Sequence, residues 1–199
     1  MFNKPKGCIT ACSDARHKTV MDYFPESERT GLFPIGRLDK DTEGLLIVTD
    51  DGQLSFKIAN PESKISKTYV FYATGEATEE KIERLRGGVI IDTKIGEIMA
   101  SAEAELLGIF KMSDIADTVS DAPARIRGTR SGSVPVCRVK ITITEGKKHQ
   151  VKKMALAVGL RVIYLERIAI SSLKLDKDLP RGEFRPLRED ELSALGYSI

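Results

Sequence analysis

The stretch GRLDKDTEGLLIVTDDG, residues 36–52, decides how the rest of the chain is interpreted. Acidic residues stand at every second position of its first half: Asp39, Asp41 and Glu43. A glycine and the apolar run 45–48 follow, and a run of this length and composition is typical of a buried β-strand. We therefore predict a polar loop that leads into a strand over residues 44–49.

The alternating acids approximate the spacing of an EF-hand calcium loop. Such a loop lies between two helices, whereas Pro34 and Gly36 precede this one and a strand is predicted in its second half. The bidentate glutamate that should close the loop is replaced by Asp50. A calcium site is therefore not favoured.

Two interpretations of the loop remain. Spacing alone favours a polar turn capped by Arg37, with the acids in solvent. The alternative is that Asp39 does chemistry, which requires a fixed and ionised carboxylate beside a cation such as Arg37. In that case Asp41 and Glu43 are expected to be turn and surface carboxylates.

The composition is that of a folded protein. The 199 residues suffice for one core, or for two small lobes that share a sheet, and 41% are hydrophobic and 30% charged. The apolar runs are too short to cross a bilayer and the first residues lack a signal-peptide core, so we predict a cytoplasmic protein with no membrane partner.

Net charge and cysteine content exclude few classes of protein. The net charge is +2, but lysines cluster within 147–153 and three arginines follow one another in a loop: Arg125, Arg127 and Arg130. Cys8, Cys12 and Cys137 are an odd number without framework spacing, which favours core-filling thiols. Zinc at Cys8, Cys12 and His17 is not favoured because no second ligand cluster follows, and we expect no metal.

Periods of two and of 3.6 residues interleave along the chain. Strands are predicted over 44–49, 67–72, 138–144 and within 160–170, and helices over 53–59, 78–85, 148–158 and 188–195. Short helices between half-polar strands indicate an α+β fold with a mixed, mainly antiparallel sheet and helices packed on it. Residues 108–134 lack clear periodicity, so we predict a long functional loop there.

The predicted helix 148–158 has one apolar face, formed by Val151, Met154, Ala155 and Val158. These residues follow the i, i+3, i+4, i+7 pattern and should face the core. Thr78 is the expected N-cap of helix 78–85, and Gly159 the expected residue after helix 148–158.

Several motifs, in order along nearly the whole chain, resemble those of one family. They are NKPKG (3–7), GRLD-x-x-T-x-GLL (36–46), SKTYVF (66–71), EGKKHQVKKMALAVG (145–159) and LPRGEFRPL (179–187). Together they are similar to the catalytic domain of RNA pseudouridine synthases, in the RsuA-type branch that acts on ribosomal RNA. The resemblance implies the pseudouridine synthase catalytic fold over residues 1–199, with no cofactor and no metal.

The resemblance also implies the site. Asp39 corresponds to the catalytic aspartate, and Tyr69 to the tyrosine that lies against the target base. The basic partner of the aspartate falls at Lys152 or Lys153, and we choose Lys152. Further substrate-binding residues would be Arg37, Lys67 and Gln150.

The chain departs from the family pattern in three respects. The S4-like RNA-binding domain that usually precedes NKPKG is expected to be absent, both basic residues of the helix motif are lysines, and the loop 108–134 is longer than the family pattern needs. We expect a monomer that modifies a uridine of ribosomal RNA, with the small subunit slightly favoured by HQVKKM. The alternatives are a large-subunit or tRNA pseudouridine synthase, and a non-catalytic RNA-binding or ribosome-assembly module.

Overall fold

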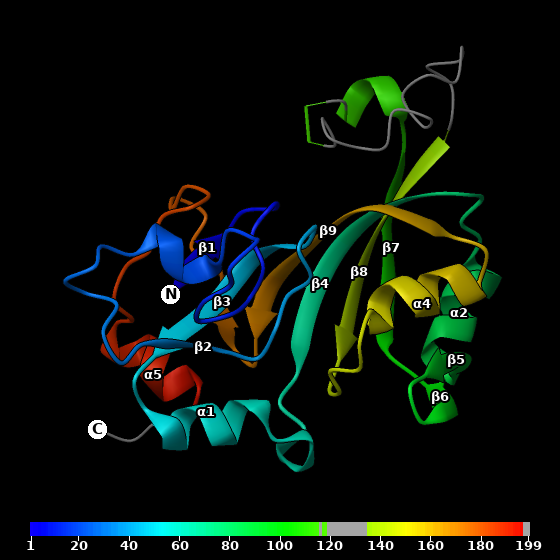
Figure 1. Cartoon of the computed structure of the whole chain (residues 1–199). Coiled ribbons are helices and arrows are strands. Elements are labelled where there is room, and N and C mark those ends of the chain that lie inside the picture. Colours follow the sequence, from blue (N-terminus) through cyan, green and yellow to red (C-terminus); the bar gives the residue numbers. More distant parts are fainter. Residues whose placement is uncertain (116, 119–134, 197–199) are drawn as a thin grey trace. The chain divides into compact units, whose positions relative to one another are not determined.

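The computed structural model describes residues 1–115, 117–118 and 135–196. The chain forms two compact units, coloured by sequence in Figure 1. Unit 1 consists of Met1–Thr68 and Glu166–Ile199, and unit 2 of Tyr69–Leu165. The chain passes from one unit to the other within strands β4 (Lys67–Thr74) and β9 (Arg161–Ile170).

Unit 1 is built around strand β3 (Glu43–Thr49), which carries the second half of the opening stretch. Strands β1 (Phe2–Lys4) and β2 (Phe33–Ile35) pair with it antiparallel, whereas β9 pairs with it parallel at Glu43 and Gly44. The remaining elements are β10 (Leu173–Lys174), α1 (Gly52–Ala59), α5 (Glu189–Ala194), η1 (Val20–Tyr23) and η2 (Pro61–Ser63).

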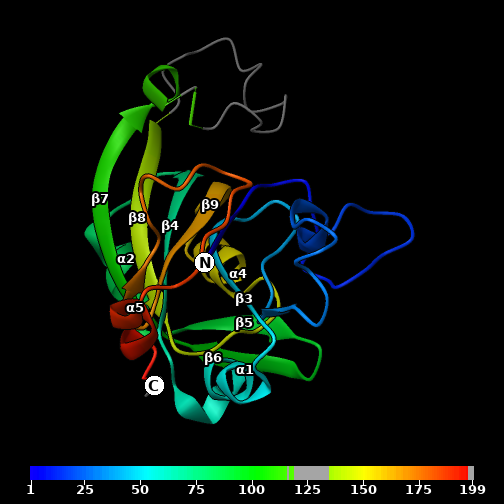
Figure 2. The same ribbon diagram turned by 90° about the vertical axis from the view of Figure 1, so that its left-hand side faces the viewer.

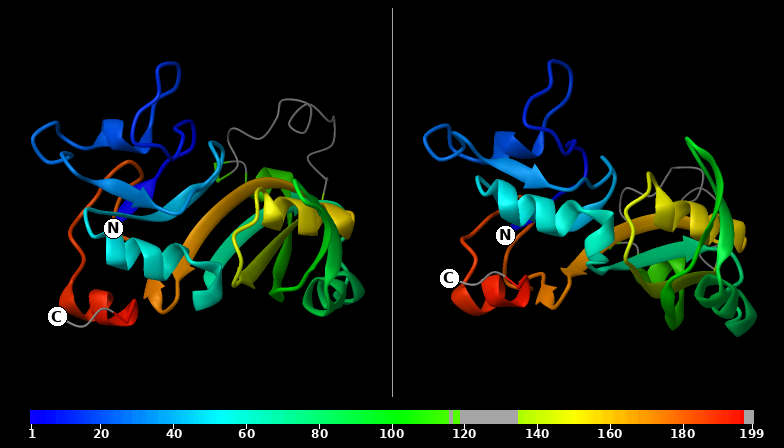
Figure 3. Two further views of the ribbon diagram at one scale, coloured as in Figure 1. Left: turned by 60° about the horizontal axis from the view of Figure 1, so that its bottom comes forward. Right: turned by 90° about the horizontal axis from the view of Figure 1, so that it is seen from below.

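The core of unit 1 lies between β3 and two helices. Leu45 and Ile47 of β3 pack in one cluster with Leu54 and Ile58 of α1 and with Leu195, which follows α5. Helices α1 and α5 are seen next to each other in Figure 3. The Asp51 side chain caps α1 by accepting hydrogen bonds from the N–H groups of residues 53 and 54. The helix therefore begins directly after the short turn that follows β3.

Unit 2 has the strand order β9-β4-β8-β7. The long strands β7 (Glu103–Lys111) and β8 (Pro135–Ile143) run antiparallel over their length, as Figure 2 shows. Its other elements are α2 (Glu79–Gly87), α4 (Gln150–Ala157), η3 (Met112–Ile115) and the antiparallel hairpin of β5 (Val89–Thr93) and β6 (Gly96–Ala100).

The sequence predictions of fold class and of most elements are confirmed. The fold is mixed α+β with mostly antiparallel strands, and each of the four predicted helices and four predicted strands exists with slightly shifted ends. Thr78 caps α2 through the Lys81 N–H, and Gly159 follows α4 at φ 77°. The four apolar residues of the α4 motif are buried as expected.

The prediction of a loop over residues 108–134 is wrong for its first residues. Residues 108–111 belong to β7, and Met112–Ile115 form η3. The pairing register shifts between Leu106 and Gly108, so a bulge inserts one residue and breaks the alternation that would have indicated a strand. Residue 116 and residues 119–134, which include Arg125, Arg127 and Arg130, lie outside the described residues.

Candidate active site

The loop 36–42, called here the Asp39 loop, is held by a buried lysine. Lys4, at the end of β1, is 0% exposed. Its ammonium donates hydrogen bonds to three backbone carbonyls: Pro5 at 3.0 Å, Asp39 at 3.2 Å and Thr42 at 2.9 Å. Burial lowers the pKa of Lys4, and the thiol of Cys8 and three nearby acids oppose this shift. Lys4 therefore fixes the backbone at Asp39 and at the end of the loop.

Two further contacts hold the same loop. The Thr10 hydroxyl donates to the Leu38 carbonyl at 2.8 Å and accepts from the Leu38 N–H at 3.1 Å. The Gly7 N–H donates to the Lys40 carbonyl at 2.7 Å. Residues on both sides of Asp39 are thus tied to the segment after β1, while the side chain of Asp39 is half-buried and Arg37 is exposed.

Glu43 differs from its predicted role. It was expected to be a surface carboxylate, but it is only 3% exposed, and its Oε2 lies 2.8 Å from Nε of Arg181. Arg181 also lies 3.9 Å from Glu166. The glutamate is the first residue of β3, and the ion pair neutralises it there. Asp41, in contrast, is exposed as expected.

Gly44 is required by close approach of a neighbouring strand as well as by its backbone conformation. Its φ is 98°, and a Cβ at this position would lie 2.3 Å from the Arg167 carbonyl oxygen. A larger residue would therefore push β9 away from β3 next to the Asp39 loop.

Sequence reasoning missed Arg167. Its side chain is 4% exposed, and its Nε donates to the Leu45 carbonyl at 2.8 Å. Its Nη2 has no hydrogen-bond partner among the described residues. Lys67, at the start of β4, is half-buried, and burial together with the charge of Arg167 lowers its pKa. A charged residue in the apolar run of β9 was the available signal.

Tyr69 and Gln150 belong to unit 2 and are both buried. Tyr69 lies in β4 and is 9% exposed. The Gln150 side chain accepts from the Lys147 N–H at 3.0 Å and donates to Glu145 at 3.4 Å, so it closes the turn before α4. His149, which precedes the helix, adopts a left-handed conformation at φ 57°.

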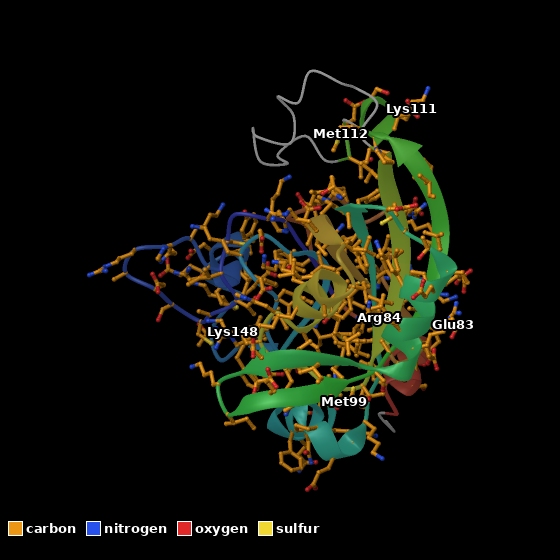
Figure 4. The ribbon with its side chains drawn as sticks, turned by 90° about the vertical axis from the view of Figure 1, so that its right-hand side faces the viewer. Glu83, Arg84, Met99, Lys111, Met112 and Lys148 are labelled. Carbon is orange, nitrogen blue, oxygen red and sulfur yellow. The ribbon has the colours of Figure 1, made fainter. Side chains whose placement is uncertain are left out.

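The two lysines of the α4 motif are both partly buried. Lys153 donates to the Asp92 carbonyl at 2.5 Å and so joins α4 to β5. Figure 4 shows the hairpin that β5 forms with β6, with Met99 labelled on it and Lys148 labelled before α4. Lys153 thus contributes to the packing of α4 against β5.

The predicted site residues thus belong to both units. Arg37, Asp39 and Lys67 are part of unit 1, whereas Tyr69, Gln150, Lys152 and Lys153 are part of unit 2. Within unit 1, Lys4 donates to the Asp39 carbonyl, and Lys67 and Arg167 lie on the neighbouring strands β4 and β9.

Three observations on the described residues concern metal ligands, cysteines and helix length. No group of three potential metal ligands occurs in the part of the chain that the structure describes. Cys8 and Cys137 are buried as predicted, but Cys12 is exposed, because it lies in the irregular segment after β1. None of the described helices is long and apolar enough to cross a membrane.

Comparisons with known proteins identify the class first. A crystal structure described as a pseudouridylate synthase matches 98% of the chain and 71% of its own length with a TM-score of 0.77 and 30% identity. The human RNA pseudouridylate synthase domain containing 4 matches 98% of the chain and 72% of its own length at 15% identity, with a TM-score of 0.52, which shows the fold alone. The class is that of enzymes that form pseudouridine.

The family follows from sequence. Residues 1–157 match the model of the RNA pseudouridylate synthase family. The uncharacterised RNA pseudouridine synthase YtzG of Bacillus subtilis is 40% identical over 98% of this chain and 72% of its own length. The ribosomal small subunit pseudouridine synthase A of Salmonella typhimurium is 35% identical over 98% and 73%. The chain belongs to the RNA pseudouridylate synthase family, as its motifs indicated, and is an enzyme that acts on RNA.

Proposed function

We propose that this protein converts a uridine of ribosomal RNA, in the small subunit, into pseudouridine and that Asp39 carries the chemistry. The observation that carries the assignment of Asp39 is the anchoring of its loop. Lys4, Thr10 and Gly7 fix the backbone on both sides of the aspartate, and a reactive carboxylate needs such a fixed position. The choice of ribosomal RNA rests on the relatives named as small-subunit enzymes.

The reaction needs neither oxidant nor external group. The N1–C1′ bond of the uridine breaks, the uracil turns, and a C5–C1′ bond forms. C5 loses its proton and N1 gains one, so atoms and electrons balance. The Asp39 carboxylate acts by attack on C1′, by addition to C6 or as a base on the sugar. We further propose that Tyr69 stacks on the extruded base and that Lys152 binds the substrate.

Arg37, Lys67, Gln150 and Lys153 are proposed to support substrate binding. Arg37 is exposed and beside the catalytic position, so it suits a phosphate of the RNA backbone. Gln150 and Lys153 act through α4, since each has a contact that fixes the ends or the packing of this helix.

The test compares Asp39→Asn with Asp41→Asn. Ribosomal RNA, isolated subunits and precursor particles are incubated with each protein, and pseudouridines are mapped at single-nucleotide resolution. We expect wild type and Asp41→Asn, which changes an exposed acid two residues away, to modify the same uridine, and Asp39→Asn to be inactive. Equal activity of Asp39→Asn would overturn the catalytic assignment.

Two further outcomes of this experiment would contradict the choice of substrate or the enzymatic role. Modification of large-subunit RNA or of tRNA alone would contradict the small-subunit proposal. RNA binding by the wild type without any pseudouridine would favour the non-catalytic alternative, an RNA-binding or assembly module.

A further inference from the structure

Two cations of unit 1, one buried and one half-buried, lie on neighbouring strands of the sheet. Arg167 is 4% exposed and Lys67 is half-buried. They belong to β9 and β4, which are neighbours in the sheet. Burial lowers the pKa of Lys67, and the charge of Arg167 lowers it further. We call these two residues the basic pair.

Among the described residues, no hydrogen bond or ion pair joins the basic pair to a carboxylate. Arg167 donates to one carbonyl through Nε, and its buried Nη2 is left without a partner. The other buried charges of unit 1 are compensated: Glu43 pairs with Arg181, and Lys4 donates to three carbonyls. Two like charges out of water without a counter-charge are unfavourable, and an anion would remove this cost.

From this arrangement we propose that Lys67 and Arg167 form an anion subsite that binds one phosphate of the RNA backbone. Lys67, the more exposed of the two, makes the contact. Arg167 lies deeper, adds a fixed positive charge and holds β3 through the Leu45 carbonyl, one residue beyond Gly44. The subsite would therefore seat the RNA against the strand that follows the Asp39 loop.

This inference rests on the proposed function for the identity of its ligand, but not for the existence of the subsite. Inorganic phosphate serves as the probe because it needs no catalysis. The melting temperature is measured in phosphate and in chloride at equal ionic strength for the wild type, Lys67→Gln, Lys67→Arg and Lys174→Gln. Lys174 is an exposed lysine on β10, opposite Ala169 of β9, and is the matched control.

We expect phosphate at about ten times its Kd to raise the melting temperature of the wild type, Lys67→Arg and Lys174→Gln by roughly 3–6 °C over chloride. Lys67→Gln should lose this increase. In chloride, Lys67→Gln should melt at the wild-type temperature or above it, because removal of one cation relieves its repulsion with Arg167. A lysine with a purely structural role would instead lower it.

RNA binding gives the second readout. Lys67→Gln should weaken binding several-fold and reduce the slope of log Kd against log salt by about 0.7–0.9, the contribution of one phosphate contact, whereas Lys174→Gln should leave the slope unchanged. Equal melting temperatures of the wild type in phosphate and chloride would overturn the subsite even if pseudouridine is formed. Conversely, a protein without activity that shows the phosphate effect would overturn the proposed function and keep the subsite.

Discussion

Replacing Lys4 by methionine should destabilise the protein, because three backbone carbonyls lose a donor. Hydrogen bonds from a charged donor contribute about 1.5–3 kcal/mol each. The Asp39 carbonyl keeps the Thr42 N–H at 3.1 Å, and the Pro5 carbonyl keeps the Cys8 thiol at 3.4 Å, so these two losses are partial. Removing a buried ammonium also relieves its desolvation cost. We expect a net loss of about 2–4 kcal/mol.

Lys4→Met should also slow the reaction, because it displaces Asp39, the proposed catalytic residue. A displacement of about 1 Å can cost about 100-fold in rate, so we expect kcat to fall at least about tenfold while KM changes less. Urea unfolding gives the stability, and single-turnover pseudouridine formation gives the rate. Lys177→Met, at an exposed lysine of unit 1, is the control and should leave both unchanged. Wild-type stability and kcat in Lys4→Met would refute the reasoning.

Three other substitutions test separate parts of the fold. Gly44→Ala should fold poorly or lose several kcal/mol of stability. About 1–2 kcal/mol come from the left-handed backbone, and the rest comes from the 2.3 Å approach of the new Cβ to the Arg167 carbonyl oxygen. Unaltered urea unfolding would contradict this. Thr78→Ala should lose about 1 kcal/mol in the same assay through the cap of α2, and no loss would mean that the cap is dispensable. The Arg185 guanidinium lowers the pKa of Glu191 to about 2. The ion pair therefore contributes fully to the free energy of unfolding above pH 4.5, the ordinary pKa of a glutamate, and this contribution is lost as the pH falls towards 2. Urea titrations from pH 6 to pH 2 should show a loss of about 1 kcal/mol in the wild type that Glu191→Gln lacks, and parallel curves would refute the assignment.

Sequence patterns predicted those helices and strands whose formation depends on residues within a few positions of one another. The alternation of residues 138–144 indicated β8 because one face of this strand is buried along its length. The apolar stripe of α4 and the Thr78 cap of α2 likewise depend on residues within one or two helical turns. The hairpin β5–β6 escaped prediction because Ile90 and Met99 are apolar but exposed, which interrupts the apolar–polar alternation of both strands.

The charged residues of the site could not be placed from sequence, because their partners are distant in the chain. Lys4 contacts the carbonyl of a residue 35 positions away, and Arg167 that of a residue 122 positions away. Glu43 stands in an alternating acidic pattern that is typical of a surface turn, and only its pairing with Arg181 explains its burial. The motif located the Asp39 loop, but the structure was needed to identify the residues that hold it.

The buried charges around this loop are not equivalent. An ion pair such as Glu43 with Arg181 can often be replaced by apolar residues of similar volume without loss of stability, because the desolvation of both charges offsets their attraction. Lys4 cannot be replaced in this way, since its partners are backbone carbonyls, which every substitution leaves in place and which need donors when buried. A loop whose groups are not paired in a sheet must obtain these donors from side chains. A long, straight cation that reaches three carbonyls at once meets this requirement, and one of these carbonyls belongs to Asp39, the proposed catalytic residue.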